Sequence, residues 1–303
     1  MKRFISALTL TLTAAATLSA CQKAPQAGPF LAMNPMLQQR APMMAANSAT
    51  QAAEHHPDFV RKMNNPAQYV FQPDTRRSIC GTENNLQHVN DYNGNEAPLD
   101  FVRGRQRAVG ALARGNDASS RKFCSGTMIT EDLFLTASHC IDASVTNDKF
   151  VAFNYEKAPG ATQLLEQEHF KVVEVVEDGI NRLDYAILRL DGKPGLKYGF
   201  SPIRAVLPEL QHQLTIIQHP KGQPKQVESG PLVSVSSGAY MGYTDLDTEP
   251  GSSGSGVLDS QGFIVGVHTN GGCYSGGGAN RGVKMTEIIK GSRVVQELNQ
   301  ARR

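Results

Sequence analysis

Short apolar runs separated by turn residues fill most of the chain between residues 107 and 270, and this spacing constrains the fold most. Strands repeated at this interval, without helical patterns between them, predict an all-β antiparallel sandwich or barrel. The runs are RAVGALARG (107–115), KFCSGTMIT (122–130), LFLTASHC (133–140), KFVAFNYE (149–156), HFKVVEVVED (169–178), DYAILRL (184–190), QLTIIQHP (213–220), PLVSVSSGAY (231–240), GVLDS (256–260) and FIVGVHTN (263–270).

Local patterns refine this picture. The alternation in VVEVVE predicts a half-buried strand. Ser260-Gln261-Gly262 predicts a tight turn, and therefore a hairpin directly after the serine-rich segment GSSGSG. Only the segment 285–300 has helical spacing, with apolar residues at 288, 289, 294, 295 and 298. We expect it to be a terminal helix that packs on the barrel.

The charge balance argues against a polyanionic partner. The 303 residues include 30 Lys and Arg against 28 Asp and Glu, and no long basic block occurs. Nucleic acid and an anionic membrane surface are therefore not expected as main partners. The 28 glycines and 16 prolines are typical of a domain rich in loops and strands.

The N-terminus has the layout of an export signal. Lys2 and Arg3 precede an apolar, threonine-rich run that is too short and too polar for a stable transmembrane helix. Leu18-Ser19-Ala20-Cys21 resembles the lipobox of bacterial lipoproteins, which implies a signal peptide over 1–20 and a lipid anchor on Cys21. The alternative is an ordinary signal with a chance cysteine.

Cysteine usage fits export. With Cys21 assigned to lipid, four of the five cysteines remain and can pair in an oxidising compartment. No two cysteines have C-x-x-C spacing, so we expect no metal. Residues 21–77 have no sustained periodicity and predict a disordered tether or prosegment, in which His55-His56 is a solvated pair. Arg76-Arg77 is a weak signal for processing.

The segment TEPGSSGSGVLD (248–259) has the composition of a linker, but it also fits a turn that exposes one reactive serine. Serine catalysis needs a histidine as base and a carboxylate that orients it. His139 follows an apolar run in TASHC, and Asp184 begins the run DYAILRL. Asp184 follows His139 by 45 residues, and Ser253 follows Asp184 by 69.

These three motifs resemble those of chymotrypsin-fold serine proteases. TASHC is similar to their histidine motif, DYAILRL to their aspartate strand, and GSSGSG to the nucleophile loop of the bacterial glutamyl-endopeptidase branch. The order His, Asp, Ser matches that fold. The resemblance implies two six-stranded antiparallel β-barrels with a C-terminal helix over 78–303. It also implies a Cys124–Cys140 disulfide beside the histidine and, with it, Cys80–Cys273.

The resemblance further implies peptide-bond hydrolysis through an acyl-enzyme, with no cofactor and with polypeptide substrates. His139, Asp184 and Ser253 would be catalytic, and the backbone N–H groups of Gly251 and Ser253 would form the oxyanion hole. We expect a monomer that is exported and lipid-anchored, and that cleavage near Arg77 would release from its anchor.

Specificity is open at this stage. Asp247 lies six residues before Ser253, where trypsin-like enzymes place the acid that attracts Lys or Arg. Thr248 and His268 match the positions where glutamyl endopeptidases bind an acidic side chain, and a partly protonated His268 would suit a carboxylate. His268 could instead bond Asp247 inside the barrel. The resemblance also implies a hydrogen bond from Thr269 to Asp184.

Two rivals remain. One is a non-catalytic binding module on the protease fold, against which the intact set of three residues argues. The other is a periplasmic protease-chaperone of the HtrA kind, for which no PDZ segment follows the expected terminal helix. Cleavage after Glu or Asp is our expectation, and cleavage after Lys or Arg is the alternative.

Overall fold

The computed structural model describes residues 78–141, 149–236 and 238–301. By its backbone contacts the chain divides into two units, Met1–Pro42 and Met43–Arg303, and all described residues belong to the second. The predicted signal peptide, the lipidated Cys21, the tether over 21–77 with His55-His56, and the processing site at Arg76-Arg77 lie outside the described residues.

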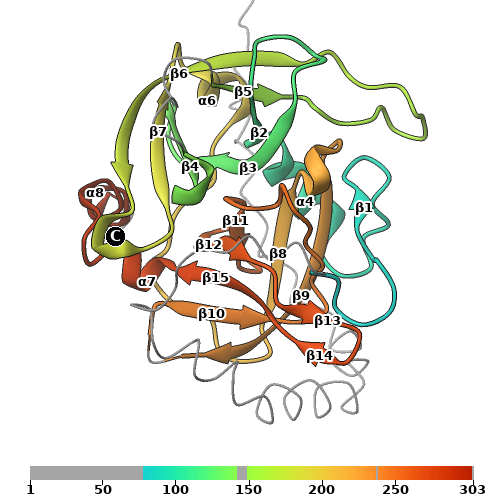
Figure 1. Ribbon diagram of the computed structural model, residues 1–303, viewed down its shortest axis with the longest axis vertical. Coiled ribbons are helices and arrows are strands. Elements are labelled where there is room, and N and C mark those ends of the chain that lie inside the picture. The colour runs from blue at the N-terminus through green and yellow to red at the C-terminus, as the bar shows by residue number, and fades with distance from the viewer. Residues whose placement is uncertain (1–77, 142–148, 237, 302–303) are drawn as a thin grey trace, which may run out of the picture. The chain divides into compact units, whose positions relative to one another are not determined.

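The first half of the described chain forms a closed antiparallel barrel in the order β2-β3-β4-β7-β6-β5 (Figure 1). Its large apolar side chains, such as Leu112, Phe134, Phe153 and Leu188, are fully buried inside it. The strands are β2 (Val109–Ala113), β3 (Lys122–Met128), β4 (Leu133–Thr136), β5 (Phe150–Phe153), β6 (Glu168–Asp178) and β7 (Ala186–Leu190).

The second half forms another antiparallel sheet, which closes into a six-stranded ring because β8 pairs with both β11 and β9. The ring contains β8 (Gln213–Gln218), β9 (Gln226–Val235), β10 (Tyr240–Tyr243), β11 (Gly256–Leu258), β12 (Ile264–Asn270) and β15 (Asn280–Lys284). Beside it, β1 (Gln87–His88) pairs with β9, and β13 (Cys273–Tyr274) pairs with β14 (Gly277–Gly278). The predicted two-barrel fold is confirmed.

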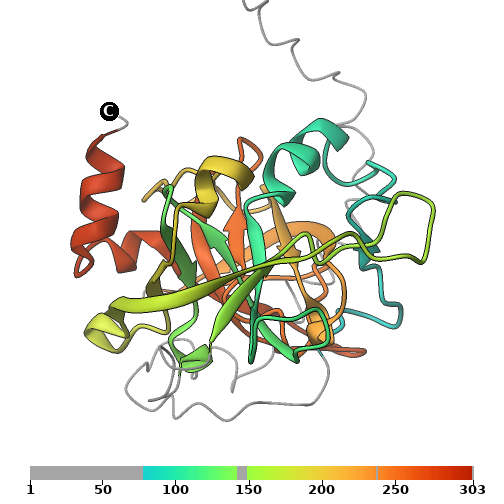
Figure 2. The ribbon, with the colours of Figure 1, turned by 90° about the horizontal axis from the view of Figure 1, so that it is seen from above.

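Helices lie outside the two barrels (Figure 2). They are α4 (Leu99–Gln106), α6 (Pro194–Tyr198), α7 (Met285–Ile288) and α8 (Arg293–Gln300), and the sequence patterns did not predict α4 and α6. None of the helices in the described ranges is long and apolar enough to cross a membrane.

The prediction of one continuous helix over 285–300 is wrong. The chain leaves the helical path after α7, and Ser292 starts α8 as its N-cap, since its Oγ accepts a hydrogen bond from the Val295 N–H at 3.0 Å. A Gly-Ser pair suits this break because Gly is a poor helix former and Ser is a strong N-cap. The Val294 N–H donates to Glu177 of β6 at 3.2 Å, which anchors α8 on the first barrel.

Strand β6 also departs from its predicted alternation. It is only partly buried, as expected, but its pairing with β7 shifts register between Val172 and Glu174 and again between Val175 and Glu177. Such bulges reverse which side chains face inward. Val173 is exposed next to the fully buried Val172, as plain alternation predicts, whereas Glu177 is buried against that alternation and accepts a hydrogen bond from the Tyr185 hydroxyl at 3.1 Å.

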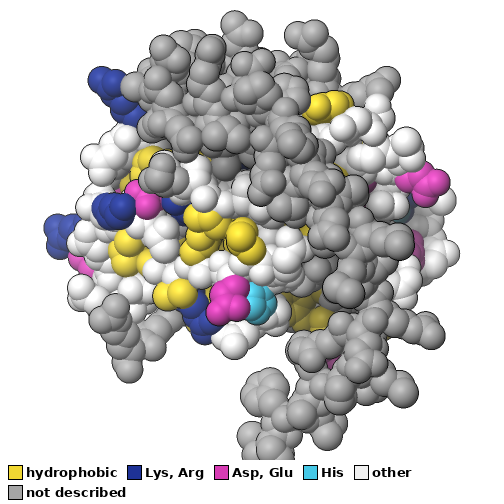
Figure 3. Space-filling model, turned by 90° about the horizontal axis from the view of Figure 1, so that it is seen from below, with side chains coloured by type: hydrophobic (Ala, Val, Ile, Leu, Met, Phe, Trp, Pro, Cys, Tyr) yellow, Lys and Arg dark blue, Asp and Glu magenta, His cyan; other side chains and the backbone are white. Residues whose placement is uncertain are grey.

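A buried polar contact joins the two barrels. The Lys225 ammonium, just before β9, lies 3.2 Å from a Glu156 carboxylate oxygen after β5, and it also donates to the Gln106 carbonyl at 2.8 Å. Both charged side chains are almost completely buried. On the face of the molecule seen in Figure 3, from below relative to Figure 1, hydrophobic side chains of the described residues are interspersed with charged side chains of both signs.

Candidate active site

His139 lies in a single 3-10 turn, Ser138–Cys140, that follows β4. Its Nδ1 atom lies 2.8 Å from Asp184 Oδ2, and its backbone N–H donates to Asp184 Oδ1 at 3.0 Å. The carboxylate therefore holds both the ring and the backbone of His139. With Nδ1 donating to a carboxylate, the imidazole keeps Nε2 as its second reactive atom.

Strand pairing places Asp184 beside His139. β4 and β7 are antiparallel, with Thr136 opposite Ala186, so the residues just beyond these ends meet. The side chains of His139 and Asp184 are 14% and 19% exposed, which leaves them accessible but largely shielded from water.

Ser253 occupies a tight loop between Pro250 and β11. Gly251 and Gly254 adopt φ values of 104° and 90°, which residues with a Cβ rarely adopt. The Ser252 Oγ accepts from the Glu249 N–H at 3.0 Å, and the Gly254 N–H donates to the His268 carbonyl at 2.8 Å. The segment GSSGSG is thus an ordered turn and not a linker.

Ser125, on β3 of the first barrel, fastens this loop. Its N–H donates to the Ser253 carbonyl at 2.8 Å, and its hydroxyl donates to the Gly251 carbonyl at 2.8 Å. The same hydroxyl accepts the His219 N–H at 2.9 Å. Sequence reasoning missed Ser125, although its place next to Cys124 offered a signal.

Disulfide Cys124–Cys140 brings the His139 turn against the Ser253 loop. Its Cys140 sulfur lies 3.8 Å from the Ser253 carbonyl oxygen. The second disulfide joins Cys80 to Cys273, and both pairings are those that the resemblance implied. In the described part of the chain one group of potential metal ligands occurs, namely Cys124, His139 and Cys140. Both of its sulfur atoms form the disulfide and therefore offer no thiolate to a metal.

The peptide planes of the loop orient two N–H groups. The Pro250 carbonyl accepts the Lys221 N–H at 2.6 Å, and the Ser252 carbonyl accepts the Ser255 N–H at 3.2 Å and its hydroxyl at 2.8 Å. In a trans peptide the N–H points opposite to the C=O. The N–H groups of Gly251 and Ser253 are therefore turned away from these partners, as an oxyanion hole requires.

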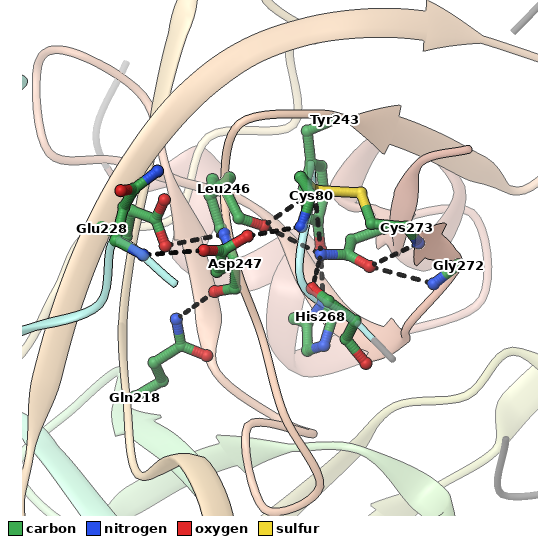
Figure 4. Close-up of a disulfide and its surroundings, with 12 residues drawn as sticks. Cys80, Gln218, Glu228, Tyr243, Leu246, Asp247, His268, Gly272 and Cys273 are labelled. Carbon is green, nitrogen blue, oxygen red and sulfur yellow. Dashed lines mark hydrogen bonds between the residues drawn. A yellow bond between two sulfur atoms is a disulfide. The ribbon is translucent and has the colours of Figure 1, made fainter. Parts of the chain in front are cut away.

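Asp247 has a different role from the one that the trypsin-like alternative requires. Its fully buried carboxylate accepts the Cys80 N–H at 2.6 Å and the Asn85 N–H at 2.9 Å. In Figure 4 it lies between Glu228 and Cys80, and its own N–H donates to Glu228 at 2.7 Å. Asp247 thus holds the segment around Cys80 and Asn85 in place. The alternative in which His268 forms a hydrogen bond with Asp247 is wrong, because His268 contacts Tyr243 instead.

Glu228 is a protonated acid in this environment. Burial raises its pKa to about 9, and the neighbouring carboxylate of Asp247 adds to the effect. Burial also raises the pKa of Asp247. The pair is therefore suited to hold backbone groups and not to attract a basic side chain from solvent.

His268 is buried on β12, and the expectation of partial protonation near neutral pH is wrong. Burial lowers its pKa to about 3, and repulsion from His139 contributes. Its Nδ1 atom lies 2.5 Å from the Tyr243 hydroxyl. Thr248 is also buried, and its hydroxyl has no hydrogen-bond partner among the described residues.

The implied bond from Thr269 to Asp184 does not form. The Thr269 hydroxyl donates to Asn270 Oδ1 at 3.0 Å. The register between β12 and β15 shifts between His268 and Asn270, and this bulge falls at Thr269. Bulges re-aim side chains locally, which gives a physical reason for the difference.

Residues 124–267 match the family model of the trypsin-like peptidase domain. Over this stretch the chain is similar to trypsin-like peptidase domains. The match covers His139, Asp184 and Ser253, and it confirms the prediction of a serine peptidase, a hydrolase, at the level of this domain.

Solved structures of proteases are also similar to the chain. A serine endoprotease from Yersinia pestis is 19% identical, with a TM-score of 0.50, over 67% of this chain and 66% of that one, so the chain spans just under two thirds of its length. A Glu endopeptidase in complex with MPD is 22% identical, with a TM-score of 0.49, over 74% of this chain and 99% of that one. No curated protein matches the chain.

Proposed function

We propose that the chain is an exported serine endopeptidase that cleaves polypeptides through an acyl-enzyme formed on Ser253. The observation that carries the proposal is the 2.8 Å contact between His139 and Asp184 on a turn that is disulfide-bonded beside the Ser253 loop. His139, Asp184 and Ser253 form the minimal set of side chains for serine acyl transfer.

In the proposed reaction, Ser253 Oγ attacks the scissile carbonyl while His139 Nε2 accepts its proton. Asp184 holds the imidazole through Nδ1 and stabilises the imidazolium that forms. The N–H groups of Gly251 and Ser253 bind the oxyanion, and removing one such donor typically costs about 100- to 1,000-fold in turnover. His139 then protonates the leaving amine, and water hydrolyses the acyl-enzyme by the same route.

We assign specificity to Glu or Asp at the residue before the cleaved bond. Thr248 supports this, since its buried hydroxyl has no hydrogen-bond partner among the described residues, and a substrate oxygen that enters the site would supply one. His268 is neutral and supplies an N–H donor. Cleavage after Lys or Arg is disfavoured, because the Asp247 carboxylate is already bonded to Cys80 and Asn85.

Export is part of the proposal. Two disulfides in one domain suit an oxidising compartment. A lipid anchor on Cys21 and release by cleavage near Arg77 rest on sequence motifs alone.

A matched pair of variants tests the enzyme assignment. Ser253→Ala should abolish peptide hydrolysis, whereas Ser229→Ala, which removes a buried hydroxyl paired with Thr215 at 2.7 Å in the second barrel, should retain it. A peptide library on the wild type should show preference for Glu or Asp. A folded wild type without hydrolysis would instead favour a non-catalytic binding module, and preference for Lys or Arg would overturn the specificity.

A further inference from the structure

The contact between Tyr243 and His268 links two strands of the second barrel. Tyr243 ends β10 and His268 lies on β12, and each strand pairs with β15, where their partners are Asn280 and Gly282. The Tyr243 oxygen lies 2.5 Å from His268 Nδ1 (Figure 4). Tyr243 is completely buried and His268 is 2% exposed, so this contact is sealed from water.

The surroundings of Tyr243 decide which atom carries the proton. The phenol packs in an apolar cluster with Leu214, Met241 and Val265. Burial raises the pKa of Tyr243 well above its ordinary value, so the hydroxyl stays protonated. Among the described residues, His268 Nδ1 is its hydrogen-bond partner. If Nδ1 carried a proton, the phenol O–H would be buried without an acceptor, at the full desolvation cost of that group.

We propose that Tyr243 is a positioning residue that holds His268 in the tautomer with its proton on Nε2. The hydroxyl donates to Nδ1, which leaves Nε2–H as the donor toward the substrate side chain. This inference rests on the proposed function for its effect on specificity, whereas the tautomer itself does not depend on it.

The fixed tautomer separates Glu from Gln. The tautomer makes Nε2–H of His268 a donor, and the Thr248 hydroxyl has no partner among the described residues, so a carboxylate that reaches these two groups accepts from both. A Gln side chain has one accepting oxygen and an NH₂ group that itself needs an acceptor. Without the Tyr243 hydroxyl, His268 can move its proton to Nδ1, and Nε2 then accepts from that NH₂ group. A site built to donate therefore discriminates against the amide only while Tyr243 is present.

The first measurement is the tautomer itself, from ¹⁵N chemical shifts of the His268 ring in full-length protein carrying Ser253→Ala, which prevents self-digestion. We expect protonated Nε2 and unprotonated Nδ1. A ring protonated on Nδ1 would overturn the proposal, whatever the enzyme cleaves. The ¹⁵N measurement needs no substitution at Tyr243, so it tests the tautomer even where a Tyr243 variant does not fold.

The second measurement is kcat/KM for matched peptides with Glu or Gln before the cleaved bond. Tyr243→Phe should reduce the Glu-to-Gln ratio about tenfold, as for loss of one hydrogen bond. Tyr92→Phe is the control, since it removes another buried phenol, which accepts the Ala97 N–H at 2.6 Å; it should leave the ratio unchanged. An unchanged ratio in Tyr243→Phe overturns the specificity role. A wild type that does not prefer Glu to Gln overturns the proposed specificity, while the ¹⁵N result still decides the tautomer.

Discussion

Ser125→Ala probes how the nucleophile loop is held. The substitution removes a hydroxyl that donates to the Gly251 carbonyl at 2.8 Å and accepts the His219 N–H at 2.9 Å. Both partners would stay in a buried region, because Ser125 is fully buried and alanine offers neither of them a replacement. The hydrogen bond from the Ser125 N–H to the Ser253 carbonyl remains, so the loop loses its attachment at Gly251 but keeps the one at Ser253.

The magnitude follows from these two contacts. Leaving a buried donor or acceptor unpaired costs about 1–3 kcal/mol, so two such groups with partial relaxation should lower the free energy of unfolding by about 2–4 kcal/mol. That corresponds to a fall of roughly 5–15 °C in Tm for a domain of this size. The looser loop would also hold the Gly251 N–H less precisely toward the oxyanion. If about 1.4 kcal/mol of stabilisation is lost in the transition state for this reason, kcat falls about tenfold.

Thermal unfolding and steady-state kinetics on the same samples test this. Ser229→Ala is the control, because it removes a buried hydroxyl paired with Thr215 at 2.7 Å in the second barrel, away from the loop. It should lower Tm while leaving kcat unchanged. If Ser125→Ala behaved like Ser229→Ala, with lower stability and unaltered turnover, Ser125 would not position the loop and the reasoning would be refuted.

Three further changes have expected outcomes. Asp184→Asn should keep the fold but lower kcat by about 10⁴, because the wrong imidazole tautomer is then favoured; a loss below tenfold would contradict the role of Asp184. Glu228→Gln should remove a pH-dependent loss of stability: the folded chain holds the Glu228 proton up to about pH 9, whereas the unfolded chain releases it near its ordinary pKa of 4.5, so stability from this group falls as pH rises between these values. Urea unfolding should therefore show the variant gaining on the wild type from pH 5 to pH 9, and a constant difference would argue against a buried neutral acid. Replacing Cys80 and Cys273 by serine opens a loop that spans a sequence separation of 193 residues and should cost about 5 kcal/mol by the chain-entropy relation, measured in denaturant, while the hydrogen bond from the Cys80 N–H position to Asp247 is retained.

The two barrels were predictable because most of their strands have a recognisable pattern in their own sequence. Runs such as 184–190 and 263–270 are apolar and bounded by turn residues, and burial of both faces keeps them in strands. Strand β15 was missed, since its sequence NRGVK contains one apolar residue among polar ones, although the barrel buries all five positions. Tertiary context decides such strands, and no local pattern reports it.

In the candidate site, too, some residues were predictable from local motifs and others depend on tertiary contacts. His139, Asp184 and Ser253 stand in recognisable local motifs, and the structure brings the His139 turn and the Ser253 loop together. The contacts of Asp247 and His268 were not predictable, because their partners Cys80 and Tyr243 lie 167 and 25 residues away. The contact of Thr269 depends on the bulge in β12, which no local pattern discloses. The neutral state of His268 likewise comes from burial, which a sequence position does not disclose.

The most direct test of the central claim is the site of covalent reaction. The folded wild type, treated with a serine-reactive fluorophosphonate and digested for mass spectrometry, should carry one phosphonyl group on the peptide TEPGSSGSGVLD, assigned by fragmentation to Ser253. Asp184→Asn should react far more slowly at the same residue. An adduct on Ser252 or Ser255, or no adduct on folded and processed protein, would contradict the account.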